Sequence, residues 1–425
     1  MTEKAPIVVF ANFLSDLAVD LDAGPVLMTW AQQAPRKAWL LRPGDVFISP
    51  VPLSREFLRY VHGLTEVPPD SVSLVEVPPA GAVPLAQAVR AAGLLGHVRA
   101  LAADRGAALL PTALDASAIA FARDIGVTVH PYSTVGAAEA ALRMTMLLNT
   151  KAGFRETAGR LGMRLPAGRV CRRPAVEGVV RELLLDHERV VVKPDRSAGG
   201  HGMIFVSRGD LGGGACLPLE GVGGPDGLWV VEECLDVAAS VSIQLAVSGS
   251  GTRVLFSGAM RTVRGSFTGY AAPLPPPVGH VRDALEAWGT ALGRHLADHG
   301  YAGPFGIDAL VDTAGVAYAS ESNIRRTATT TPHAMVSRLT AGSAAAPAWS
   351  VGKGRARRPM DFDGALARLR AARLAFDGQG GEGVVLYADA PPDGRSWRYA
   401  VIAASAGDLE AQEGALAEVL GFESR

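Results

Sequence analysis

The sequence predicts an α/β protein that begins with a parallel α/β domain and ends in a small α+β domain. Three observations support this prediction. The chain has 425 residues, enough for about two to three domains of roughly 150 residues each. Short apolar runs alternate with Ala-rich helical stretches in residues 1–135, which is typical of an open, largely parallel sheet. Residues 360–425 read in turn as a helix, two strands and a helix.

The first domain, residues 1–135, is expected to open with a buried strand at residues 7–10. Short apolar runs at 38–41 and 46–48 are flanked by Gly and Pro residues and are predicted as further strands. Residues 53–64 carry apolar side chains at helical spacing.

The second block, residues 136–345, contains most of the predicted strands. It starts with helical stretches at 139–148 and 154–161, and its best helix spans 281–299, where Gly300 ends the apolar period. Apolar runs predict strands at residues 190–194, 203–206, 229–232, 241–247, 253–260, 305–311 and 316–319.

A linker is expected at residues 343–359, which are rich in Ala, Pro, Gly and Arg. The small domain at 360–425 then follows. Its predicted helices span 365–376 and 408–420, and its predicted strands span 384–387 and 398–403.

Composition excludes several classes of protein. Lys and Arg number 41 against 42 Asp and Glu, so no basic surplus exists to bind nucleic acid by bulk electrostatics. Cys171, Cys216 and Cys234 form no CxxC pattern, which argues against a disulfide framework or a structural zinc site. The apolar run at 7–10 is too short for a signal-peptide core, and no run approaches the ~18 residues of a membrane span. The sequence therefore predicts a cytoplasmic protein with no membrane or nucleic-acid partner.

The first candidate site is a lysine followed by a Gly-rich loop. Lys193 ends an apolar strand, and the loop after it carries Ser197, Gly199, Gly200, His201 and Gly202. A bound phosphate would pair the lysine, and glycines let backbone N–H groups approach phosphate oxygens closely. The alternative is an ordinary Gly-rich hairpin with a surface lysine.

The second candidate site combines Asp308 with the run Glu321-Ser322-Asn323. Glu321 and Asn323 are two residues apart, so they face the same side of an extended chain. If 305–311 and 316–319 pair antiparallel, the three oxygen ligands converge, and such ligands suit Mg²⁺ bridged to phosphates. Arg325 continues the alternation and could hold a phosphoryl group or a developing oxyanion. The alternative is a solvated turn at the end of a strand.

The third candidate is the strand 229–232, which runs into the acids Glu232 and Glu233. Such a strand can present backbone groups to the edge of an adenine. A core strand that meets a surface turn is the alternative reading.

In this order, these pieces resemble the ATP-grasp superfamily over about residues 137–340. The resemblance rests on Lys151 before a helix, on the Val-Val-Val-Lys-Pro strand with its loop, and on the 13-residue step from Asp308 to Glu321. The leading domain and the small tail look like the pre-ATP-grasp ligases, and the pheganomycin-type peptide ligases are the nearest suggestion. The resemblance implies an ATP-grasp fold in which two α+β lobes clasp ATP.

The resemblance also implies roles for single residues. Lys151, Lys193 and the loop from Ser197 to Gly202 would contact the nucleotide phosphates. Glu232, with the backbone of Glu233 and Leu235, would bind adenine. Asp308, Glu321 and Asn323 would hold Mg²⁺, and Arg325 the transferred phosphoryl group. Two positions depart from the family pattern. Asp236 stands where a ribose-binding acid is expected, and Gly306 replaces an arginine whose charge Arg261 or Arg264 would have to supply.

The implied reaction is ATP-dependent formation of an amide or peptide bond through an acyl phosphate, on an amino acid or small peptide in specialised metabolism such as antibiotic biosynthesis. Arg325 and Arg264 would stabilise the oxyanion. His333 is a candidate base for the amine, with a loop histidine of no catalytic role as the alternative. A phosphotransferase on the same scaffold and a nucleotide-binding protein without catalysis also stay open. The sequence leaves the oligomeric state open, a homodimer included.

Overall fold

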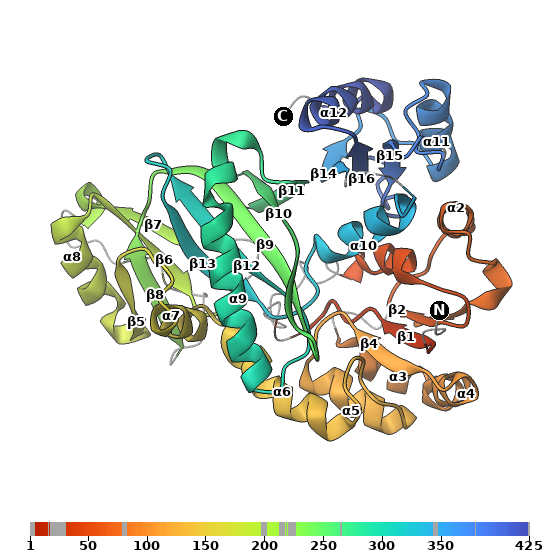
Figure 1. Cartoon of the computed structure of the whole chain (residues 1–425), viewed down its shortest axis with the longest axis horizontal. Coiled ribbons are helices and arrows are strands. Elements are labelled where there is room, and N and C mark those ends of the chain that lie inside the picture. The colour runs from red at the N-terminus through yellow and green to blue at the C-terminus, as the bar shows by residue number, and fades with distance from the viewer. Residues whose placement is uncertain are drawn as a thin grey trace.

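The computed structural model contains three sheets, with helices packed around them (Figure 1). The residues that the structure describes are 5–15, 17, 31–78, 83–196, 202–211, 217, 219, 227–263, 266–342, 347–378 and 380–423.

The N-terminal domain contains the predicted parallel sheet. Its strand order is β3-β2-β1-β4, and every pairing is parallel. The strands are β1 (Ile7–Phe10), β2 (Val46–Ser49), β3 (Ser73–Glu76) and β4 (Ala108–Pro111). The helices are α2 (Arg55–Thr65), α3 (Leu85–Ala91), α4 (Leu95–Arg105) and α5 (Ala116–Ile125).

The strand predicted at 38–41 is wrong. Residues Ala34–Leu40 form the 3-10 helix η1, and Pro35 stands in its first turn, where a fixed φ and a missing N–H are tolerated. Nearly all of η1 is buried, on every side. A fully buried run carries no periodicity, so its sequence cannot separate strand from helix.

Two helices lead from this domain into the rest of the chain. They are α6 (Val135–Leu148) and α7 (Lys151–Arg160). The hydroxyl of Thr134 accepts a hydrogen bond from the amide of Ala137, and that of Thr150 accepts one from Gly153. These are ordinary N-terminal caps, and the second cap sets the start of the helix that carries Lys151.

A small antiparallel sheet forms one lobe, in the order β5-β8-β6-β7. The strands are β5 (Gly168–Arg172), β6 (Arg189–Pro194), β7 (Ile204–Ser207) and β8 (Leu228–Glu233). Helix α8 (Val176–Asp186) packs on this sheet around a core of its own that includes Val180, Val192 and Trp229.

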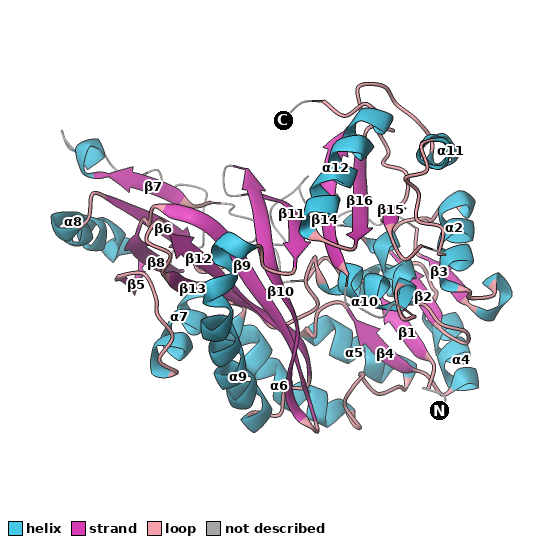
Figure 2. Ribbon diagram, turned by 45° about the horizontal axis from the view of Figure 1, so that its top comes forward, coloured by secondary structure: helices cyan, strands magenta, loops and turns pink. Residues whose placement is uncertain are grey.

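The largest sheet has eight strands, in the order β13-β12-β9-β10-β11-β14-β16-β15 (Figure 2). Its first part contains β9 (Val237–Ser248), β10 (Gly251–Val263), β11 (Ser266–Ala272), β12 (Gly303–Asp312) and β13 (Ala317–Asn323). Helix α9 (Arg282–Asp298) covers β9 and β10. The tail adds β14 (Ala348–Arg355), β15 (Gly383–Leu386) and β16 (Ser396–Ala403), with helices α10 (Thr330–Leu339), α11 (Phe362–Ala371) and α12 (Ala406–Leu420).

The prediction of a linker at 343–359 is wrong, because β14 lies inside it and pairs with both β11 and β16. The glycines of β14 suggested a linker, but they have a structural reason. A Cβ on Gly352 would lie 2.5 Å from the Tyr399 hydroxyl, and one on Gly354 would overlap the Phe422 ring. These glycines therefore make room for aromatic packing.

The tail is joined to the first domain as well as to the central sheet. One core cluster contains Trp39 and Phe57 together with Phe362 and Trp397. The rings of Phe57 and Phe362 lie edge to face, with their centroids 5.8 Å apart. The tail therefore packs as part of the body of the molecule.

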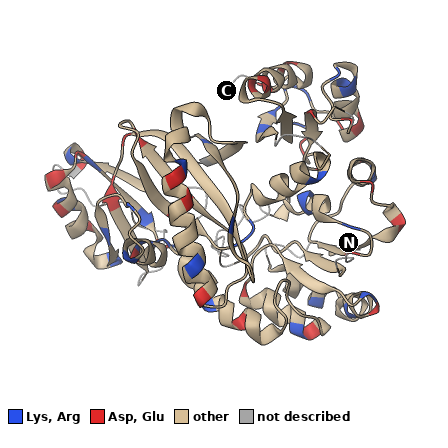
Figure 3. Ribbon diagram, in the orientation of Figure 1, with Lys and Arg blue, Asp and Glu red and all other residues tan. Residues whose placement is uncertain are grey.

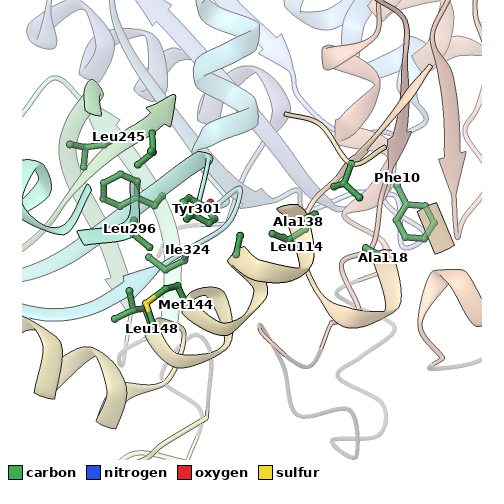
Figure 4. Packing of buried hydrophobic residues seen from close by; sticks show 14 of the residues in the cluster. Phe10, Leu114, Ala118, Ala138, Met144, Leu148, Leu245, Leu296, Tyr301 and Ile324 are labelled. Atoms are coloured by element: carbon green, nitrogen blue, oxygen red, sulfur yellow. The ribbon is translucent and has the colours of Figure 1, made fainter. Parts of the chain in front are cut away.

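A second core cluster joins the first domain to the central sheet (Figure 4). Phe10 stacks on Phe121 at 4.7 Å between ring centroids. Farther along, Met144 and Leu148 of α6 belong to the same cluster as Ile324, which follows β13. This continuous packing fixes the parallel domain against the sheet that carries Asp308.

Basic and acidic side chains are interspersed over the outer helices (Figure 3). Within the part of the chain that the structure describes, no helix is both long and apolar enough to cross a lipid bilayer.

Candidate active site

A cavity of about 810 Å³ lies where the sheets meet. Its walls come from the small lobe (β6, β8), from β12 and β13, from the first domain, and from β14 and β16 of the tail. Of the predicted site residues that the structure describes, those lining the cavity are Lys151, Lys193, Glu232, Glu233, Leu235, Asp308, Glu321, Asn323 and Arg325.

A β-bulge brings the predicted metal ligands together. Ala309 pairs with Ala319, but the next pair along is Asp308 with Glu321, so β13 has one extra residue at this point. The extra residue rotates Glu321 onto the face of Asp308, since directly opposed residues of an antiparallel pair share a face. The Nδ2 of Asn323 donates a hydrogen bond to Asp308 Oδ2 at 3.0 Å.

The two carboxylates oppose each other electrostatically. Burial, followed by the charge of Glu321, raises the pKa of Asp308 well above its ordinary value. A divalent cation would offset both the cost of burying the Asp308 carboxylate and its repulsion by Glu321. The described residues hold no group of three His, Cys, Asp or Glu side chains that could bind a metal, so the third ligand would be the Asn323 amide. Two carboxylates and an amide oxygen fit Mg²⁺.

The two lysines approach the same cavity from different elements. Lys151 begins α7, and its Nζ lies 3.8 Å from Glu321 Oε2. Burial lowers the pKa of Lys151, and the Glu321 charge opposes that effect. The backbone after β6 holds the helix start in place, because Asp195 accepts hydrogen bonds from the amides of Lys151 and Ala152 at 3.0 and 2.8 Å.

The side chain of Glu232 does not fit the predicted adenine role. It is buried and forms ion pairs with Lys193 and with Arg155, the latter at 2.6 Å. A carboxylate already committed to two cations is poorly placed to recognise a base. Its contacts are those of a positioning residue that holds Lys193 toward the cavity.

The residues at the end of β8 and just after it were predicted to bind adenine, and the structure agrees with this only in part. Glu233 lines the cavity, but its amide donates to the Ala167 carbonyl at 2.8 Å. Leu235 lines the cavity as well. The ribose role of Asp236 stays a prediction: its side chain is 72% exposed, pairs with Arg189 at 2.5 Å and is not among the residues that line the cavity.

Arg325 depends on a residue that the sequence did not reveal. Its Nη1 donates to Asn149 Oδ1 at 2.7 Å, and the same oxygen accepts from the Ile324 amide at 3.1 Å. Asn149 directly precedes Thr150, the cap of the helix that begins at Lys151. This position before a helix cap was the feature of the sequence that could have pointed to Asn149. Asn149 thus ties the arginine to the lysine helix.

The space above Gly306 is filled by a neutral side chain. A Cβ at Gly306 would overlap the Gln244 amide, and Thr327 donates to Gln244 Oε1 at 3.0 Å. Arg261 does not supply the charge expected here, because it pairs with Glu413 at 2.7 Å and does not line the cavity. Gln244 and Thr327 were missed, because they become neighbours only through strand pairing.

Five predicted residues lie outside the described part of the chain: Ser197, Gly199, Gly200, His201 and Arg264. Gly202 is described and has a φ of 72°, a backbone conformation that favours glycine.

His333 of α10 is half-buried. Its ring is tilted against that of Phe256 with 4.4 Å between centroids, and it lies 6.2 Å from the ring of Trp349. It does not line the cavity, and its buried Nδ1 has no hydrogen-bond partner among the described residues. Burial, then the charge of Arg253, lowers the pKa of His333 to about 4. These contacts give His333 a role in aromatic packing and disfavour it as a base.

Replacing His333 with phenylalanine should therefore change stability and leave catalysis intact. The folded-state pKa is depressed, so the unfolded chain binds the extra proton, and stability falls as pH drops from 6.5 toward about 4. The full effect is about 3 kcal/mol for a shift of this size. Urea unfolding from pH 7 to 4 should give a flatter pH dependence for the variant. A large loss of turnover at unchanged stability would restore the catalytic role.

An antiparallel central sheet, a smaller antiparallel lobe and a parallel leading domain around one cavity define the ATP-grasp fold. Residues 34–127 match the family model of the pre-ATP-grasp domain, and residues 364–416 match that of the PGM1 C-terminal domain. No curated protein matches the chain.

Solved structures resemble the chain over nearly its full length. N5-carboxyaminoimidazole ribonucleotide synthetase from Thermus thermophilus is 14% identical, with 97% of this chain and 98% of that chain covered and a TM-score of 0.58. The Staphylococcus aureus N5-carboxyaminoimidazole synthetase complexed with ADP is 11% identical, with 98% of both chains covered and a TM-score of 0.55. The biotin carboxylase domain of Hydrogenobacter thermophilus 2-oxoglutarate carboxylase is 14% identical, with 99% and 91% covered and a TM-score of 0.58. These likenesses establish the fold.

Proposed function

We propose that the chain is an ATP-dependent carbon–nitrogen ligase, which joins the carboxylate of one small molecule to the amine of another through an acyl phosphate. The observation that carries the proposal is the convergence of Asp308, Glu321, Asn323, Lys151 and Arg325 on one cavity. Structures with the same fold contain ADP, and one contains MgADP and bicarbonate. A protein that only stored a nucleotide would not need such a concentration of phosphate-directed charge.

The residues around the bulge fit a magnesium ion, and the two lysines fit a nucleotide. Asp308, Glu321 and Asn323 would hold Mg²⁺, which when bound neutralises charge on the phosphates. Lys151 and Lys193 would contact the α- and β-phosphates. Leu235 and its neighbours after β8 would border the adenine.

The proposed reaction has two steps. The substrate carboxylate attacks the γ-phosphorus of ATP, the bond between that phosphorus and the β,γ-bridging oxygen breaks, and ADP leaves. The amine then attacks the acyl carbon, the bond from carbon to the phosphate oxygen breaks, and the nitrogen loses a proton. Arg325 lies beside both metal acids and would hold first the transferred phosphoryl group and then the oxyanion.

We further propose an amino acid or small peptide as substrate, in the biosynthesis of a specialised metabolite such as an antibiotic. The match of residues 364–416 to the PGM1 C-terminal domain supports this, together with the resemblance to pheganomycin-type peptide ligases. We also propose that the protein works in the cytoplasm, where ATP is available.

The test is a search for coupled products. Purified protein with Mg·ATP should release ADP and phosphate only when a suitable acid and amine are both present, and mass spectrometry should find their condensation product, minus water. ADP with an acid or alcohol heavier by one phosphoryl group would instead identify a phosphotransferase. Failure to bind Mg·ATP at all would overturn the proposal.

A further inference from the structure

We propose that the tail end of the cavity binds an anionic group of a substrate, a carboxylate or a phosphate, through Arg36, Lys353 and Arg398. This inference deepens the proposed function and rests on it, because it concerns the same cavity. All three residues line that cavity. They come from the first domain and from the tail, which gives those two parts a role in substrate recognition.

Arg36 is built into the wall. It is 5% exposed, and its guanidinium carbon lies 5.8 Å from the Phe13 ring centroid and 5.4 Å from that of Tyr387. It also donates hydrogen bonds to Gln33. Two aromatic rings beside a guanidinium fix the direction in which it points. A buried guanidinium without a carboxylate partner costs free energy, and a bound anion would offset that cost.

Lys353 and Arg398 stand opposite each other on β14 and β16. Directly opposed residues of an antiparallel pair share a face, and like charges in that position repel. The carbonyl of Arg398 accepts from the amide of Tyr387 at 3.2 Å, which fixes the strand beside the Arg36 group. The charge of Arg36 also acts on Arg398, so these two cations are gathered where their repulsion disfavours them.

The two arginines at this end of the cavity have no carboxylate partner. Among the described residues, no carboxylate forms an ion pair with Arg36 or Arg398. Burial, then the charge of Arg36, lowers the pKa of Arg398 to about 10. The acids that line the described part of the cavity lie at its other end, on β8, β12 and β13: Glu232, Glu233, Asp308 and Glu321.

The position of the cationic end defines the substrate class. Four steps across the sheet separate β12 from β14, which is roughly 20 Å at about 4.8 Å per strand. An anionic group held at the tail end is therefore remote from the atoms that react beside Asp308. The substrates are elongated molecules, of which one carries a second anionic terminus. A carboxylate, as in an amino acid or peptide, and a phosphate both satisfy this chemistry.

The test uses small probes on the folded protein saturated with Mg·ADP. N-acetylglycine and phenyl phosphate represent the two anions, and N-acetylglycinamide is the neutral control. We expect calorimetric binding of at least one anion, weakened about tenfold or more in Arg398→Gln and partly restored in Arg398→Lys. Arg294→Gln changes an exposed arginine of α9 outside the cavity and should bind as the unmodified protein does.

The outcomes of this experiment either support or overturn the anion site. A preference for N-acetylglycine assigns a carboxylate, and a preference for phenyl phosphate assigns a phosphate. Equal binding by Arg398→Gln and the unmodified protein, equal binding of the neutral amide, or binding of neither anion overturns the inference. Tight Mg·ADP binding in Arg398→Gln would confirm an intact nucleotide site. If the unmodified protein does not bind Mg·ADP but discriminates between the probes in its absence, the proposed function fails and the anion site stands.

Discussion

Replacing Glu321 with glutamine should lower the turnover of ADP formation by about a thousandfold. Glutamine keeps the shape of the side chain but removes the charge that a magnesium ion needs beside Asp308. The fold should survive, because the substitution relieves the repulsion that, after burial, raises the pKa of Asp308. The 3.8 Å pair with Lys151 is lost, and the free energy of unfolding should change by about 1 kcal/mol or less.

The matched control is Glu182→Gln, which removes the same charge from an exposed ion pair with Arg169 on the small lobe. It should keep full turnover. Steady-state kinetics and thermal unfolding of both variants make the comparison. Full activity in Glu321→Gln would remove this residue from the metal site, and a collapse of stability with activity would make its role structural.

Replacing Lys193 with methionine should weaken Mg·ATP binding by about a hundredfold, the value of a charged hydrogen bond to phosphate. The variant should still fold, because Glu232 keeps its 2.6 Å ion pair with Arg155 after the lysine is gone. The buried carboxylate is therefore never left without a cation, which is the situation that destabilises most.

Isothermal titration with Mg·ATP checks this expectation. Arg169→Met serves as the control, since Arg169 is an exposed cation of β5 in the same lobe and does not line the cavity. Unchanged affinity in Lys193→Met would assign the lysine a structural role as the partner of Glu232.

The positions of most strands and the polar residues near Asp308 were predictable because they depend on local pattern. Alternation along Glu321, Asn323 and Arg325 is visible in the sequence, and so is the apolar strand that ends at Lys193. The bulge that turns Glu321 toward Asp308 was not visible. Without it the two acids would face opposite sides of the sheet.

Three readings of the sequence differ from the structure for another reason. In each, a residue or segment has its partner far away in the sequence. Asp236 was read as a ribose ligand, but Arg189 engages it on the outside. His333 was read as a base, but Phe256 and Trp349 enclose it. The Gly-rich strand β14 was read as a linker because its aromatic partners come later in the chain.

The residues that were missed are long-range in the same sense. Arg36 and Arg398 are 362 positions apart in the numbering of the chain, and only the packing of the tail against the first domain brings them to one cavity. Asn149 and Arg325 are brought together in the same way, by the packing of α6 beside β13. The sequence showed Asn149 before a helix cap, but a single sequence does not show which distant residue it pairs with.

The measurement that tests the ligase reaction most directly follows oxygen atoms. Once an acid and an amine that condense have been found, the acid is supplied with ¹⁸O in its carboxylate, and the released phosphate is analysed by mass spectrometry. A reaction through an acyl phosphate transfers one labelled oxygen from the carboxylate to inorganic phosphate, and the amide keeps the other. Phosphate released without label would contradict the acyl phosphate and the ligase mechanism built on it.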